Sequence, residues 1–104
     1  MFVQVHTDNH LKGGAEFRDE ITGMVESSLG RFADRITDVE VHLSDQNGMK
    51  GGENDLRCSI EVRLAGLSPL GVSHEATVLG DVVQGALERV ERLLQHHLGR
   101  IEAG

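Results

Sequence analysis

The chain has few aromatic residues and almost no cysteine. Its 104 residues include three phenylalanines but no tryptophan or tyrosine, so aliphatic side chains must build any core. Many modules that bind single-stranded RNA stack its bases on aromatic side chains, and this chain has few side chains that could do so. The single cysteine excludes an internal disulfide, and the sequence shows no long apolar span or signal-peptide run. We therefore expect a cytoplasmic protein that does not contact a membrane.

Basic side chains are also scarce. Seventeen acidic and ten basic residues give a net charge of -7, which disfavours non-specific attraction to nucleic acid or anionic lipid. The imbalance is uneven, because residues 1–55 carry a net charge of -6 and residues 56–104 carry -1. Any surface that binds a polyanion is therefore expected in the C-terminal half.

Apolar periodicity predicts four strands and two helices. Period-two alternation predicts strands with one dry and one wet face over residues 3–6, 39–43, 56–64 and 70–78. Apolar residues three and four apart predict helices over residues 17–32 and 79–101, with Asp81 as a plausible cap near the start of the second. The polar segment 45–55 holds three glycines and should be a long hairpin loop.

The order strand, helix, three strands, helix predicts one domain over residues 1–104. A right-handed crossover makes the first two strands parallel neighbours, and hairpins continue the sheet antiparallel. Each helix has one apolar stripe and each strand one apolar face. The simplest arrangement is an α+β two-layer sandwich, a four-stranded mixed sheet with both helices on one face.

The last predicted helix separates its charges by sign. Its acidic residues lie on one flank of the apolar stripe: Glu88, Glu91 and Glu102. On the other flank, cationic residues follow at steps of three, four and four: Arg89, Arg92, His96 and Arg100. This ridge fits phosphates or an acidic partner, and the alternative interpretation is an ordinary solvated face with intrahelical ion pairs.

The first predicted helix is acidic, and its outermost line consists of the small residues Gly23, Ser27 and Gly30. Interior glycines cost about 1 kcal/mol each relative to alanine. One interpretation is close approach of a protein partner along a smooth groove. The other is a weak helix that tertiary packing holds in place.

Two pairs of side chains could carry chemistry. Cys58 and His74 fall in the dry phase of adjacent strands, where burial beneath the helices favours a structural role over catalysis. His6 and His42 fall in the wet phase of adjacent strands and could share a divalent metal, but no motif supplies the four ligands of a structural zinc site. No catalytic constellation can be placed, so we expect no enzyme activity, no metal and no cofactor.

Several segments, in this order of elements, resemble the ribosome hibernation-promoting factor and protein Y family. Residues 35–44 resemble its helix exit and second strand, and residues 58–64 its third strand. Residues 76–94 resemble its last strand and helix, with Asp81 opening an Ala/Leu-rich helix that contains Glu91-Arg92-Leu93. The similarity covers most of residues 3–101.

The resemblance implies a fold related to double-stranded RNA-binding domains and a non-enzymatic factor that competes with tRNA on the small ribosomal subunit. Such factors silence translation in starved cells, and basic residues of both helices meet 16S rRNA. Here the last helix keeps a version of these residues in Arg89, Arg92 and Arg100, whereas the first has Ser27 and Ser28 where the family tends to carry lysines. The resemblance also implies that the C-terminal dimerisation domain of long family members is absent.

Two functional hypotheses follow. The first is a ribosome-associated hibernation or translation factor that binds the small subunit through its last helix. The alternative is an acidic, diverged paralogue that acts as a protein-interaction or regulatory module and no longer binds ribosomes. Its partner would be a basic protein or a second copy of the chain.

Overall fold

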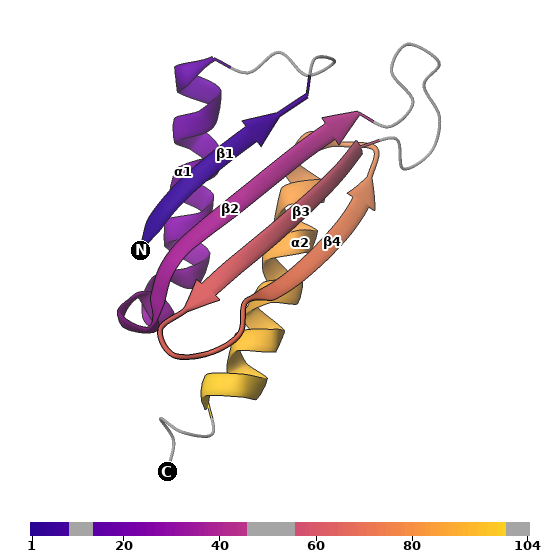
Figure 1. The fold of residues 1–104 in the computed structure, drawn as a ribbon. Coiled ribbons are helices and arrows are strands. Elements are labelled where there is room, and N and C mark those ends of the chain that lie inside the picture. Colours follow the sequence, from indigo (N-terminus) through magenta and orange to yellow (C-terminus); the bar gives the residue numbers. More distant parts are fainter. Residues whose placement is uncertain (9–13, 46–55, 100–104) are drawn as a thin grey trace.

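The computed structural model describes residues 1–8, 14–45 and 56–99 (Figure 1). One sheet has the strand order β1-β2-β3-β4, in which β1 is parallel to β2 and the other pairs are antiparallel. The strands are β1 (Phe2–Thr7), β2 (Ile36–Asp45), β3 (Leu56–Leu64) and β4 (Leu70–Ala76). The predicted mixed sheet is confirmed. The predicted hairpin loop falls at residues 46–55, outside the described residues.

Both helices lie on one face of the sheet. In Figure 1, α1 (Ala15–Leu29) lies behind β1 and β2, and α2 (Leu79–Leu94) lies behind β3 and β4. A 3-10 helix, η1 (Gly30–Arg35), follows α1, and a π-helical turn, η3 (Gln95–Gly99), extends α2. The predicted α+β two-layer sandwich is therefore confirmed, and no helix or strand of the described residues covers the other face of the sheet. None of the described helices is long and apolar enough to cross a membrane.

The core between the two layers is almost entirely aliphatic, as the scarcity of aromatic residues requires, and Phe32 of η1 is its one buried aromatic residue among those described. Buried and accessible residues alternate along β2 and β3, which confirms the predicted dry and wet faces. The main strand and helix residues of the core are all at most 5% exposed: Val39, Val41, Leu43, Cys58, Ile60, Val62, Leu64, Ile21, Val25, Leu29, Val82, Val83, Ala86, Leu87, Val90 and Leu94. At about 25 cal/mol per Å² of buried apolar surface, this layer is the main source of stability.

The start of α2 differs from its prediction. Strand β4 ends at Ala76, and Val78, which was expected on the dry face of the strand, is the N-cap residue of α2 and is 55% exposed. The predicted capping role of Asp81 is wrong, because no side chain caps this helix and Asp81 lies within its first turn. There its carboxylate interacts favourably with the positive end of the helix dipole.

The C-terminal end of α2 also departs from a regular helix. His97, which was expected on the apolar stripe, is exposed, and Leu98 is buried instead. The reason is the π-helical turn at Gln95–Gly99, because its larger number of residues per turn moves His97 off the apolar stripe and brings Leu98 onto it. A projection at a constant 100° per residue does not include this widening.

Candidate nucleic-acid interface

Arg89 and Arg92 lie side by side along the edge of the sheet. Both are exposed on α2, beside β4, which is the edge strand of the sheet. An open hollow of about 440 Å³ separates the helix from the strand, and its lining joins residues from both elements: Gly71, Val72, Ser73, Arg89, Arg92 and Leu93. The structure thus brings together two of the four side chains of the predicted ridge.

A second hollow, of about 390 Å³, continues around the edge of β4. It is lined by Arg57, Ser73, His74, Glu75 and Arg89. Arg57 belongs to the open face of β3, yet the β3–β4 pairing places it opposite Glu75 and next to the strand edge. The hollow therefore adds a third arginine to the surface. The sequence did not single out Arg57 because the charged residues along β3 are of both signs. Only the pairing of β3 with β4 brings Arg57 near α2.

One carboxylate, that of Glu75, lines the second hollow together with Arg57 and Arg89, but it forms no ion pair with either arginine. Across residues 1–8, 14–45 and 56–99, no ion pair involves Arg57, Arg89 or Arg92. The predicted alternative of intrahelical pairs is absent for Arg92, whose neighbour one turn earlier is Glu88. These three guanidinium groups are therefore available to an external anion, and their planar geometry suits phosphate.

Arg63 shows the opposite situation on the same sheet. Its guanidinium donates to Asp38 at 2.8 Å and lies 2.9 Å from Glu61 and 3.6 Å from Glu40. The hydrogen bond to Asp38 and the charges of these carboxylates raise the pKa of Arg63 further above its ordinary value. Arg63 is thus a positive charge that the protein itself compensates.

The other two residues of the predicted ridge are placed differently. His96 is exposed in η3 and meets the ring of His97 edge-on, with centroids 5.2 Å apart. It lies outside both hollows that Arg89 lines. Arg100 lies outside the described residues. Their role in binding stays a prediction.

Gly85 determines how closely β4 approaches α2. A Cβ atom at this position would overlap the imidazole ring of His74, so the ring lies directly on the helix backbone. Gly85 is one helical turn before Arg89, and the contact therefore sets the distance between the strand edge and the first arginine.

Cys58 lies opposite His74 in the β3–β4 pairing, but its thiol is buried in the core. Burial raises the pKa of Cys58 from 9.0 to about 12, so the thiol is protonated at neutral pH. The predicted burial is confirmed, and a protonated, inaccessible thiol is not suited to act as a nucleophile.

The predicted line of small residues runs along the outer face of α1 and ends at the first residue of η1. Gly23, Ser27 and Gly30 are exposed, and a Cβ atom at either glycine would meet nothing within 4 Å. Exposed acidic residues accompany them: Glu16, Asp19, Glu20 and Glu26. The two helices therefore present surfaces of different character, acidic on α1 and arginine-bearing on the β4 side of α2.

This β-α-β-β-β-α sandwich is a fold found in solved structures of protein Y domains and of ribosomal subunit interface proteins. Superposed on the N-terminal domain of Thermus thermophilus protein Y, the chain gives a TM-score of 0.73 at 22% identity, covering 93% of this chain and 99% of that domain. A ribosomal subunit interface protein from Coxiella burnetii gives a TM-score of 0.69 at 16% identity, with 100% of both chains covered.

No protein-family model matches the sequence, and no curated protein is similar enough in sequence to count as a relative. At these identities the likeness to the two structures establishes the fold. It confirms, at the level of the fold, the resemblance to protein Y that the sequence indicated.

Proposed function

We propose that this protein is a ribosome-associated, non-enzymatic factor that binds 16S rRNA of the small subunit and restrains translation under stress. The contacts would be made by α2 and the adjacent edge of β4. Arg89 and Arg92 would bind phosphates, Arg57 would extend their surface, and His96 and Arg100 would continue it toward the C-terminus.

One observation carries this proposal. In a chain with a net charge of -7, Arg57, Arg89 and Arg92 line two adjoining hollows and make no ion pair with the rest of the described chain. Because phosphate contacts dominate the affinity of proteins for RNA, such a cluster can supply the attraction that the net charge opposes.

The rest of the surface suits recognition of RNA shape rather than of bases. The chain has no tryptophan or tyrosine, so a stacking platform is lacking. Within the described sheet, β4 pairs on one side only, with β3. Backbone N–H groups on its outer edge therefore stand beside the arginines and can donate to phosphate or ribose oxygens. The fold shared with a protein named for a ribosomal subunit interface supports the same choice of partner.

Co-sedimentation with small ribosomal subunits at low salt tests the proposal. We expect the wild-type protein to sediment with the subunits and the Arg89→Glu/Arg92→Glu variant to remain in the supernatant. The matched control is Arg18→Glu/Arg31→Glu, which has the same net charge but alters exposed arginines of α1 and η1. Absence of wild-type binding, or equal binding of the two variants, would contradict the proposal.

A second candidate function rests on α1. The fold itself does not require glycine at positions 23 and 30, because an added Cβ would meet nothing there. A partner surface that approaches this smooth acidic face would explain them, and the protein would then be an interaction module for a basic protein or for a second copy of the chain. A pull-down that recovers a basic protein without rRNA, and loses it in Ser27→Arg, would support this candidate. Recovery of whole subunits with Ser27→Arg as with wild type would count against it.

A further inference from the structure

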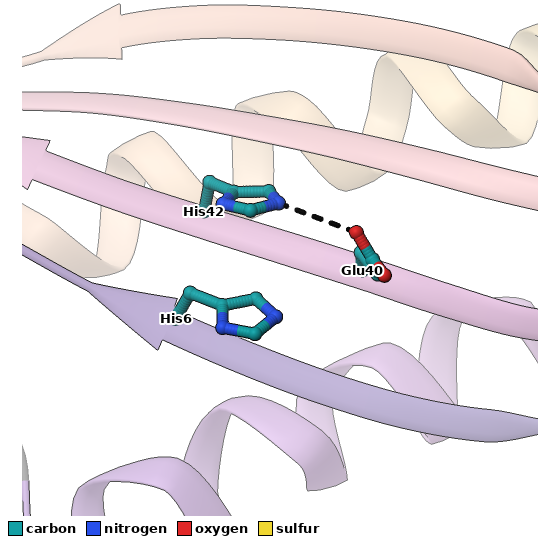
Figure 2. A group of neighbouring side chains, drawn as sticks. All are labelled: His6, Glu40 and His42. Atoms are coloured by element: carbon teal, nitrogen blue, oxygen red, sulfur yellow. Dashed lines mark hydrogen bonds and ion pairs between the residues drawn. The ribbon is translucent and has the colours of Figure 1, made fainter.

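A cluster of two imidazoles and a carboxylate stands on the open face of the sheet, away from both helices. His6 on β1 and His42 on β2 are register partners in the parallel pair, and Glu40 precedes His42 by two residues on the same face. Figure 2 shows the three side chains rising from the same side of the two strands. Parallel pairing and period-two alternation thus bring His6 together with two residues that lie 34 and 36 positions later in the chain.

The potential ligand atoms of this cluster are close to one another. One nitrogen from each imidazole and one carboxylate oxygen all lie within 4.8 Å of one another. His42 Nε2 is 3.5 Å from Glu40 Oε2, and the rings of His6 and His42 stack with centroids 4.7 Å apart at 18°. Ligand atoms at about 2.1 Å from a tetrahedral ion are about 3.4 Å from one another. Small rotations of these accessible side chains would bring the ligand atoms from their present separation to that distance.

We propose that His6, Glu40 and His42 bind one divalent transition-metal ion, of which Zn²⁺ is the best match. Two imidazoles and one carboxylate are ligands that zinc accepts, and they form an open site in which water or a partner group takes the fourth position. Magnesium and calcium prefer sites made only of oxygen, so this donor set selects against them.

The charges around the cluster also favour a cation. Glu40 directs Oε2 toward His42, while its other oxygen is 3.6 Å from Arg63. Arg63 is shared with Asp38 and Glu61, so three carboxylates surround a single guanidinium. The local excess of negative charge attracts a divalent ion, and Arg63 limits that attraction because it competes for Glu40.

The sequence alone suggested only the two histidines, and we expected no metal there. Glu40 was missed because its link to His42 is the two-residue step of a strand, rather than the spacing of a known metal motif. The pairing of His6 with His42 depends on the register of β1 against β2. The site does not depend on the proposed function, and it does not include the arginines of α2.

Titration calorimetry of the full chain, free of any purification tag, tests the site with Zn²⁺ and Mg²⁺ as probes. We expect one Zn²⁺ per chain and no heat from Mg²⁺ at the same concentration. His6→Asn, His42→Asn and Glu40→Gln should each weaken Zn²⁺ binding at least about tenfold. His97→Asn is the matched control, because it removes another exposed imidazole and should leave the affinity unchanged.

A variant with the opposite effect makes the test sharper. Arg63→Gln frees Glu40 and removes a positive charge, so it should strengthen Zn²⁺ binding by roughly threefold or more. Circular dichroism would verify that each variant is folded. The proposal is overturned if wild type binds no Zn²⁺, if Glu40→Gln and His42→Asn bind it as wild type does, or if His97→Asn abolishes binding.

Discussion

Arg63 and Arg89 carry the same guanidinium group, but their surroundings give them different roles. Three carboxylates on β2 and β3 surround Arg63, whereas Arg89 makes no ion pair in the described part of the chain. Exposed ion pairs add little stability, so the network of Arg63 chiefly removes a charge from the surface. At the scale of a residue, the neighbours decide which positive charges remain for a partner.

Cys58 is the residue whose chemistry burial changes most. Its thiol is inaccessible and its pKa is raised to about 12, so we expect a thiol reagent to leave it unmodified in the native protein and to react fully after denaturation. Absorbance on reaction with a disulfide reagent, with and without urea, measures this. Rapid labelling of the folded protein would contradict the burial and would reopen a catalytic role with His74.

The same pKa shift predicts how stability depends on pH. Because the pKa rises from 9.0 to about 12 on folding, between these values the native state keeps a proton that the unfolded state loses. The contribution of Cys58 is therefore fully present below about pH 9 and decreases as pH rises, by at most about 1.4 kcal/mol per pH unit. Urea unfolding from pH 8 to 10.5 should show this loss in wild type, and Cys58→Ala should show a weaker dependence.

At the scale of elements, the contact between β4 and α2 fixes the candidate interface. The ring of His74 on β4 lies against Gly85 on α2, and Gly85 is one helical turn before Arg89. Strand and helix therefore approach closely next to the first arginine of the interface. The two exposed glycines Gly23 and Gly30 have no such contact. Glycine therefore has a packing role in α2 that it does not have in α1 or at the start of η1.

Gly85→Ala and Gly23→Ala should change stability in opposite directions. Alanine is favoured over glycine in a helix by about 1 kcal/mol, and at position 23 its Cβ meets nothing, so Gly23→Ala should stabilise by about 0.5–1 kcal/mol. At position 85 the Cβ overlaps the His74 ring, and the forced shift should cost about 1–3 kcal/mol. Urea denaturation of both variants measures the difference.

A double variant separates this overlap from other effects at position 85. In a His74→Ala background the ring is absent, so Gly85→Ala should be neutral or stabilising. The coupling energy between the two substitutions should then account for most of the stability that Gly85→Ala loses in the wild-type background. If Gly85→Ala costs the same in both backgrounds, the contact with His74 is not what requires glycine.

At the scale of the whole molecule, the distribution of charge matters more than its sum. The net charge is -7, yet the acidic excess is concentrated in residues 1–55, and the uncompensated arginines Arg57, Arg89 and Arg92 lie together in the other half of the chain. In the function that we propose, a polyanion would approach the edge of β4, where these three arginines supply positive charge on an acidic protein. Such an arrangement favours one orientation of binding and disfavours non-specific attachment elsewhere.

Salt dependence of binding tests this view. Each phosphate contact contributes roughly 0.7–0.9 to the slope of log affinity against log salt concentration. Arg89→Gln/Arg92→Gln should therefore reduce the slope for small-subunit binding by about 1.4–1.8 relative to wild type. The control Arg18→Gln/Arg31→Gln should leave the slope unchanged, and equal slopes for all three proteins would contradict a role for α2.

The sequence predicted much of the fold because periodicity is a local property. Period-two alternation predicts the burial of strand residues such as Val39 and Val41. Helical spacing predicts the burial of Val83, Ala86 and Val90. The same local pattern placed Arg89 and Arg92 on one flank of a helix. Where local geometry changes, as at the π-helical turn that exposes His97 and buries Leu98, a constant period failed.

The sequence by itself thus determined the order of elements, the dry faces of the strands and the pair of arginines on the last helix. Only the tertiary structure brought Arg57 to Arg89 around the edge of β4, laid His74 on Gly85, and completed the pair of His6 and His42 with Glu40. Periodicity needs only neighbours along the chain. Contacts between strands depend on sheet order and register, which are decided when the whole apolar layer is buried at once.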